Sequence, residues 1–325
     1  DTKNEVFRPA RSRANSAFVT NGGMKSKAFS IGDPHGEFDH ILSAIDQWHP
    51  DAVLILGDLT PSHSLDEIFK GVKGTKIYWI PGNHDTDSDL IYDRLWRSSF
   101  AKHNLHGRVQ DVCGVKVAGL GGVFRGQIWM PPAMPLYASP SLFIRKIGKS
   151  GMWRGGLPRR HRSTSFPECL CKKLKECKAD ILITHEAPSM HPKGFKALDD
   201  LAVQNGLKII FHAHQHESKR YCPCNGLCAR GIGLRGIIDL EGNVIVPAQV
   251  DPRELEAKVR SAPSPVKTQL EERRLLSSGV SIDSIGFQER DGLTGSPKKG
   301  NDRDKFSVSG CSLIISQVNE TVGFY

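Results

Sequence analysis

The chain has 325 residues, a formal net charge of +9, 38% apolar residues and 24% charged residues. This length allows one large domain or two modest ones, and the composition is that of a globular rather than a disordered chain. No apolar run approaches the length of a bilayer span, so no transmembrane helix is expected. The positive charge favours anionic partners such as phosphate esters, nucleotides or nucleic acid, although it is equally consistent with a plain basic surface.

Short apolar runs alternate with polar motifs along the first 250 residues. Strands are expected in short, mostly apolar runs, at Ala28–Ile31, 52–56, 76–80, 115–118, Ile181–Thr184 and 208–211, of which 52–56 is unbroken. Helices are expected at 39–48, with Asp39 as N-cap, and at 87–103 and 196–205. Runs at 234–240 and 244–247 flank Glu241-Gly242-Asn243 and predict a terminal β-hairpin. Strand, polar motif and helix in repetition indicate an α/β fold with its site at the carboxyl ends of strands.

Three segments interrupt or flank this pattern. Residues 124–168, which we call the basic insertion, are rich in proline, aromatic residues and arginine (Arg154, Arg159, Arg160 and Arg162). Such a long insertion suits a substrate lid or a nucleic-acid groove, but its aromatic side chains Trp129, Phe143 and Trp153 are interpreted first as packing residues. The domain itself is expected at 25–250, after a polar arm at 1–24. Met24 is an alternative start of the protein. A weakly ordered tail is expected at 251–325, with some strand character at 306–318.

Five polar motifs follow the predicted strands, and all consist of residues that bind hard metal ions. They are Asp33-Pro-His35-Gly, Gly57-Asp58, Gly82-Asn83-His84-Asp85, His185 and His214-Gln-His216. Aspartate and asparagine are also common turn and cap residues, which would explain one motif alone. Five motifs in one order predict a site that holds two metal ions at a sheet edge.

This ordered set resembles the calcineurin-like metallophosphoesterase superfamily over about residues 25–250. The resemblance implies a four-layer α/β/β/α sandwich of two mixed sheets flanked by helices, and a phosphoester hydrolase with two divalent ions (manganese, iron, zinc or nickel). It implies Asp33, His35 and His216 as ligands of one ion, Asn83, His185 and His214 as ligands of the other, and Asp58 as the bridging carboxylate. A metal-bridged hydroxide would then attack phosphorus in line. His84 would be the general acid that assists the leaving group, and Asp85 the carboxylate that orients it.

Several residues near these motifs have more than one interpretation. Ala213 stands where the family generally has glycine, and His212 allows a shifted ligand register of His212 with His214; we prefer His214 with His216. Arg125 is either a phosphate contact or a solvent-exposed side chain. The remaining histidines are expected to be surface or capping residues: His40, His49, His63, His103, His106, His161 and His191.

Eight cysteines without a visible secretory signal predict reduced thiols and a cytoplasmic location. Two clusters, Cys169, Cys171 and Cys177 and then Cys222, Cys224 and Cys228, allow a structural zinc site, but their spacings are unusual for one.

Three functions fit the sequence. The leading one is a metal-dependent phosphoester hydrolase acting on a phosphate-ester substrate. The first alternative is a nuclease or nucleotide phosphodiesterase on the same site, suggested by the net charge and the basic insertion. The second alternative is a non-catalytic binding scaffold, which is disfavoured because all seven ligand positions and His84 are filled.

Overall fold

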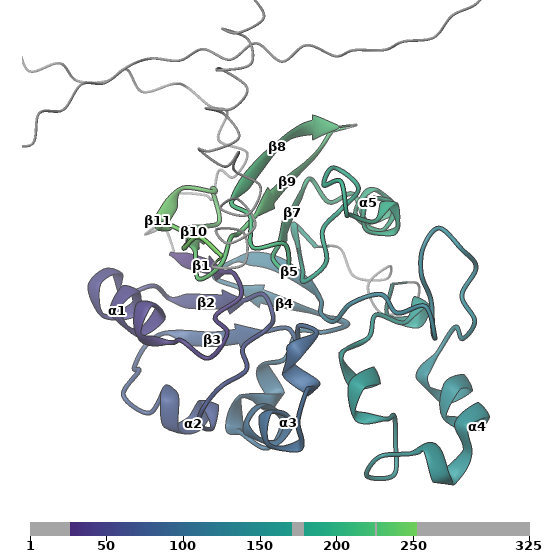
Figure 1. The fold of residues 1–325 in the computed structure, drawn as a ribbon. Coiled ribbons are helices and arrows are strands. Elements are labelled where there is room, and N and C mark those ends of the chain that lie inside the picture. Colours follow the sequence, from purple (N-terminus) through teal and green to yellow (C-terminus); the bar gives the residue numbers. More distant parts are fainter. Residues whose placement is uncertain (1–26, 171–178, 225, 252–325) are drawn as a thin grey trace, which may run out of the picture. The chain divides into compact units, whose positions relative to one another are not determined.

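Two β-sheets form the centre of the protein in the computed structural model (Figure 1). The structure describes residues 27–170, 179–224 and 226–251, so the predicted arm and nearly all of the predicted tail lie outside the described residues. All described residues belong to the first of two units of the chain, Asp1–Ala262, and the second unit, Pro263–Tyr325, lies outside the described residues.

The first sheet has the strand order β11-β10-β1-β2-β3. Its strands are β1 (Ala28–Ile31), β2 (Ala52–Ile55), β3 (Lys76–Trp79), β10 (Ile237–Asp239) and β11 (Val244–Val246). Strands β1, β2 and β3 are parallel, with Ala28 opposite Ala52 and Ala52 opposite Lys76, whereas β10 and β11 pair antiparallel. The carboxyl ends of the three parallel strands therefore lie at one edge of the sheet.

The second sheet has the order β4-β5-β6-β7-β9-β8. Its strands are β4 (Arg108–Val112), β5 (Val115–Leu120), β6 (Ile181–Thr184), β7 (Ile209–His212), β8 (Lys219–Cys224) and β9 (Leu227–Gly231). Strands β5, β6, β7 and β9 are parallel, and the outer strands β4 and β8 are antiparallel. Both sheets are thus mixed, as the sequence predicts.

Apolar side chains divide the molecule into four layers. One buried cluster joins the two sheets, with Leu54 and Ile80 from the first and Ile183 and Phe211 from the second. A second cluster lies between the first sheet and the helices α1 (Asp39–Trp48), α2 (Leu65–Ile68) and α3 (Asp89–Trp96). A third lies between the second sheet and α5 (Lys196–Gln204). This confirms the predicted α/β/β/α arrangement.

The basic insertion packs on the rest of the domain. It contains α4 (Pro140–Gly151), whose first turn is capped by the Ser139 side chain, and the 3₁₀ turn η3 (Arg159–Ser163). Phe143 is 8% exposed and belongs to the cluster that covers the second sheet. The Trp153 ring packs edge-on against Tyr92 of α3, with 4.8 Å between centroids. These contacts agree with packing roles for the insertion's aromatic residues.

Three arginines of the insertion bind α3 and the turn before it. Arg154 pairs with Asp93, Arg159 with Asp89, and Arg162 donates to the Tyr92 hydroxyl over 2.8 Å. These three arginines therefore attach the insertion to α3.

Some elements differ from the expectations. Helix α1 has Phe38 as N-cap without a side-chain bond, and Asp39 is its first helical residue, so the predicted Asp39 cap is wrong. The segment predicted as one helix at 87–103 divides into α3 and a 3₁₀ turn, η2 (Ser99–His103). No described helix is long and apolar enough to cross a bilayer.

Candidate metal centre

All seven predicted ligands lie just beyond the carboxyl ends of strands. Asp33 and His35 follow β1, Asp58 follows β2 and Asn83 follows β3. His185 follows β6 of the second sheet, and His214 and His216 follow β7. Because loops at the carboxyl ends of parallel strands gather at one edge, residues up to 183 positions apart are brought to one place.

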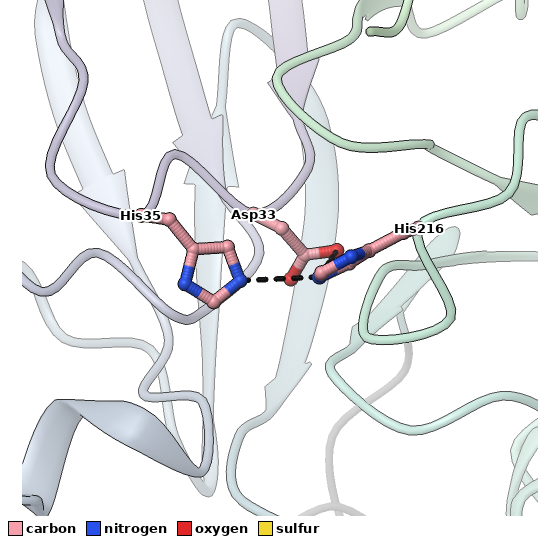
Figure 2. Close-up of side chains that lie close together, drawn as sticks. All are labelled: Asp33, His35 and His216. Carbon is pink, nitrogen blue, oxygen red and sulfur yellow. Dashed lines mark hydrogen bonds and ion pairs between the residues drawn. The ribbon is translucent and has the colours of Figure 1, made fainter. Parts of the chain in front are cut away.

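The first potential metal-binding group consists of Asp33, His35 and His216 (Figure 2). One ligand atom from each lies within 4.8 Å of the others. The Nε2 atoms of His35 and His216 are 3.1 Å apart, and Nε2 of His216 is 3.9 Å from Oδ2 of Asp33. Figure 2 shows both rings directed toward the Asp33 carboxylate. This is the ligand set that the sequence predicts for one ion.

The second group consists of Asp58, His185 and His214, again within 4.8 Å of one another. Oδ1 of Asn83 lies 3.0 Å from Nε2 of His185, which places the predicted amide ligand beside this group. Oδ2 of Asp58 is 3.5 Å from Nε2 of His185 and 3.8 Å from Nε2 of His35, a ligand of the first group. Asp58 therefore lies between the two groups, as a bridging carboxylate must.

The backbone at the site is in a conformation that most residues avoid. Five of the ligand residues have positive φ angles: Asp33 (40°), His35 (45°), Asp58 (49°), His214 (65°) and His216 (57°). Left-handed conformations of non-glycine residues cost free energy and cluster at functional sites. This loop geometry turns each side chain from its strand toward the common centre.

Two glycines allow the loops to approach each other closely. A Cβ atom on Gly82 would lie 2.2 Å from both the backbone nitrogen and Oδ1 of Asp58, and one on Gly57 would lie 2.3 Å from Nδ1 of His185. Gly57 also has a φ of 100°. The glycines of the motifs are thus required by contact as well as by backbone conformation.

Hydrogen bonds fix the orientation of the ligands. Nδ1 of His185 donates to the Leu56 carbonyl over 2.8 Å, and Nδ1 of His216 lies 2.5 Å from Oδ2 of Asp251. Each contact leaves Nε2 directed at the centre, the usual arrangement of metal-binding histidines. The backbone N–H of His214 donates to Oδ2 of Asp33 over 2.8 Å, which joins the last motif to the first.

Two of the predicted imidazole ligands are neutral in the metal-free protein, and a third carries a proton that a metal ion would displace. Burial lowers the pKa of His35 to about 4 and that of His214 to about 3, so both rings are neutral at physiological pH. Although burial opposes ionisation of Asp58, His185 and the N–H of His84 hold its pKa below the usual range. Burial favours the neutral ring of His185, but the carboxylates of Asp58 and Asp33 raise its pKa to about 10.

The Asp33 carboxylate provides a test of whether a cation fits here. Asp33 is fully buried, burial raises its pKa well above the usual value, and its Oδ1 atom has no hydrogen-bond partner in the described part of the chain. A buried acceptor without a partner is costly, and a bound cation would satisfy it. The residues present therefore fit a pair of divalent ions.

The residues predicted to act on the leaving group are arranged differently from the expectation. Nδ1 of His84 lies 2.6 Å from Oδ2 of Asp87, so the carboxylate that contacts this ring belongs to Asp87 and not to Asp85. Asp85 is fully buried and accepts bonds from the backbone N–H groups of Thr60 (2.9 Å) and Gly82 (2.7 Å). Asp85 holds the loops after β2 and β3 together and does not orient His84.

The alternative ligand register does not fit the geometry. His212 is 1% exposed and its ring lies 5.7 Å from that of Tyr221, outside both groups. His216 lies in the first group instead. Ala213 is 1% exposed in the core between the sheets, so the methyl group is accommodated there.

Other residues at the site carry no motif that would have revealed them. Glu186 is 6% exposed, Oε2 of this residue is 3.9 Å from Nε2 of His214, and burial raises its pKa to about 7. Asp251 lies at the end of the described chain and reaches His216 only through the fold. The one signal in the sequence is that Glu186 directly follows the ligand His185.

The expectation that the remaining histidines are surface or capping residues is wrong for two of them. His161 and His191 are 8% and 4% exposed, so both are buried.

Nε of Arg125 donates to the Thr164 hydroxyl over 3.1 Å, and Arg125 is half-buried rather than solvent-exposed. The possible zinc site is not described, because Cys171 and Cys177 and the side chains of Cys222 and Cys224 lie outside the described residues.

Comparison with known proteins assigns the family. The model of the calcineurin-like phosphoesterases matches residues 29–218, and the chain belongs to this family. An uncharacterized protein of Haemophilus influenzae is 43% identical over 223 residues, which cover 69% of this chain and 97% of that protein. Phosphoester hydrolysis is accordingly the class of activity of this chain.

Solved structures with a similar fold are distant in sequence. A phosphopantetheinyl hydrolase from Mycobacterium tuberculosis is 14% identical with a TM-score of 0.41, covering 74% of this chain and 93% of that one. A calcineurin-like phosphoesterase from Bacillus subtilis is 15% identical with a TM-score of 0.38, covering 69% and 88%.

Proposed function

We propose that the protein hydrolyses phosphate esters with two divalent metal ions held at the candidate metal centre. Asp33, His35 and His216 would hold one ion, and Asn83, His185 and His214 the other, with Asp58 shared between them. The observation that carries this proposal is the convergence of two adjacent His/Asp groups, each within 4.8 Å, at the meeting edge of the two sheets. Imidazole and carboxylate ligands suit manganese, iron, zinc and nickel.

The ions, when bound, would supply Lewis-acid polarisation of a phosphoryl oxygen and a nucleophile that is active at neutral pH. The chain's own residues prepare the site for them. The neutral rings of His35 and His214 present free lone pairs, and Asn83 adds an oxygen ligand without adding negative charge that would repel a phosphate.

His84 is placed to protonate the leaving oxygen. Its side chain is 45% exposed and lines a cleft of about 390 Å³ next to the ligand His35, with 5.6 Å between the two ring centroids. Asp87 contacts Nδ1 of His84, which leaves Nε2 for the substrate. A carboxylate in this position orients a catalytic imidazole.

The cleft of about 390 Å³ has room for a phosphoryl group and for the part of a leaving group next to it. The nuclease alternative keeps only part of its basis, because three arginines of the basic insertion are bound to α3 residues, whereas Arg145, Lys146, Lys149 and Arg160 are exposed.

The test is a panel of phosphomonoesters and phosphodiesters assayed with manganese, iron, zinc and nickel, together with elemental analysis of the purified chain. We expect turnover of at least one ester that depends on added metal and is abolished by Asp58→Asn. Asp46→Asn, an exposed change on α1, is the matched control and should leave turnover unchanged. A metal-loaded chain that cleaves none of these esters would rule the proposal out.

A further inference from the structure

The cleft beside the candidate metal centre is larger than the phosphoryl group needs. It is lined by His35, His84 and His216, which face the proposed position of that group, and also by Leu234, Arg235 and Asp251. The remaining space must therefore accommodate the leaving group. Arg235 is the only lysine or arginine among the described residues that line the cleft.

Arg235 is held firmly to the loop that carries two metal ligands. Its backbone N–H donates to Gly32 over 2.9 Å, and its Nε donates to the carbonyl of Pro34, between Asp33 and His35, over 3.2 Å. Its Nη1 donates to Oε1 of Gln249 over 2.8 Å. Arg235 also has a φ of 57°, a conformation in which non-glycine residues are rare and are found at functional sites.

The positive charge of Arg235 is not neutralised within the described part of the chain. The two carboxylates that share the cleft are used elsewhere, since Asp251 contacts His216 and Asp87 contacts His84. Arg235 forms no ion pair with a described carboxylate, and its Nη2 has no hydrogen-bond partner among the described residues. Its charge is felt outside the cleft as well, because burial and then Arg235 lower the pKa of His40.

We infer that Arg235 forms an anion subsite that binds a second negatively charged group, a carboxylate or a phosphate, on the leaving-group side of the substrate. A positioned guanidinium group with free N–H donors is the usual partner of such groups. Leu234 provides an apolar contact beside it. The substrate class is then a small phosphoester that carries a second anion. This inference rests on the proposed function, because the metal-ligand groups must hold the scissile phosphoryl group.

Non-hydrolysable ligands test the subsite without turnover. Benzylphosphonate carries one anionic group, and its 4-carboxy and 4-phosphonomethyl derivatives add a second of either kind. Binding of all three to the metal-loaded protein would be measured by calorimetry. We expect the unmodified protein to bind one or both derivatives about tenfold or more tightly than benzylphosphonate. This factor is the usual contribution of a charge-assisted hydrogen bond. The derivative that is preferred identifies the second group as carboxylate or phosphate.

The variants Arg235→Gln and Arg235→Asn should abolish this preference. Because the preference is a ratio of affinities, it does not depend on any change at the metal ligands that follows from losing the hydrogen bond between Arg235 and Pro34. Asparagine tolerates a positive φ, so the second variant guards against misfolding of the first. Arg108→Gln, an exposed change on β4, is the matched control and should retain the preference.

Two results would overturn the inference about Arg235 and leave the proposed function intact. One is equal binding of all three ligands by the unmodified protein, and the other is an equal loss of affinity for all three in the Arg235 variants, which would place Arg235 on the scissile group. Failure of the metal-loaded protein to bind any phosphonate, combined with no turnover of any ester, would contradict the proposed function itself and the inference with it.

Discussion

Nδ1 of His84 lies 2.6 Å from Oδ2 of Asp87, three residues further along the chain. The contact orients an exposed ring beside the metal ligands, and Asp87 also lines the cleft. The expectation from the sequence assigned this role to the adjacent Asp85, whose carboxylate instead binds two backbone N–H groups. The pair His84 and Asp87 is therefore the part of the site where the mechanism can be tested separately from metal binding.

Removing this pair should slow turnover without emptying the site. His84→Ala should lower kcat by about 10²- to 10⁴-fold for esters with poor leaving groups, the usual contribution of a general acid, and by much less for 4-nitrophenyl phosphate. Asp87→Asn should lower kcat about tenfold for esters with poor leaving groups and by less for 4-nitrophenyl phosphate. Steady-state kinetics with a series of aryl phosphates would measure it.

Metal content is the control for these two variants. Elemental analysis should find it unchanged in both, because neither side chain belongs to the two ligand groups. Loss of metal in His84→Ala would mean that His84 is a ligand and that its assignment as general acid is wrong.

Replacing the shared carboxylate should affect both ions, whereas replacing an outer ligand should affect one. Asp58→Asn is expected to lower the metal content for both sites, since Oδ2 of Asp58 lies near His35 and His185 alike. His35→Ala should lower it for the first site only. Metal-to-protein ratios after dialysis would be compared. If both variants lost the same amount, Asp58 would not be shared.

Metal affinity should increase with pH. Metal ligands must be deprotonated, and the metal-free protein holds a proton on His185, whose pKa the carboxylates of Asp58 and Asp33 raise to about 10. Since binding displaces this proton at any pH below that pKa, affinity should increase about tenfold per pH unit. Competition with a chelator at pH 6, 7 and 8 would measure the slope.

The slope should fall by about one proton in His185→Asn, which keeps a potential ligand atom but removes the titrating ring. Asp58 should contribute little to the slope because its pKa is already low. An affinity that is constant from pH 6 to 8 would contradict this account of the site.

Gly82→Ala tests the close approach of the loops after β2 and β3. The added methyl group would lie 2.2 Å from atoms of Asp58, so we expect destabilisation by about 1–3 kcal/mol or more and a loss of metal binding. Gly71→Ala, where a Cβ atom would meet nothing within 4 Å, is the matched control and should do neither. Chemical denaturation with and without metal would show both effects. Normal metal affinity in Gly82→Ala would contradict the geometry.

The sequence predicts those parts of the fold whose residues are buried on both sides. Strand β2 is an uninterrupted apolar run, β1 and β6 each contain one hydroxyl residue among apolar ones, and all three are fully buried in the structure. Strand β4 was not predicted because it is an outer strand with mostly exposed side chains and the sequence Arg-Val-Gln-Asp-Val. Strand β8 is not predicted for a similar reason, since it is the other outer strand and contains a proline. The inner strand β9 is not predicted either, because its sequence Leu-Cys-Ala-Arg-Gly has no continuous apolar run. Outer strands lack the alternation or continuity that identifies buried ones.

The local sequence also decides which site residues can be predicted. The ligands directly follow apolar runs, so local sequence identifies them. Asp87 and Asp251 have only ordinary polar neighbours in sequence, and their contacts with His84 and His216 arise from loop conformation and long-range packing. Helix α2 has a sequence signal that predicts where it begins, the capping box of Ser64 and Glu67.

The most direct measurement is a crystal structure of the manganese-equilibrated protein with anomalous diffraction at the manganese edge. The account predicts two anomalous peaks, one among Asp33, His35 and His216 and one among Asp58, His185 and His214, with Asp58 in contact with both. A map with no peak at either group, from protein that retains its fold, would contradict it.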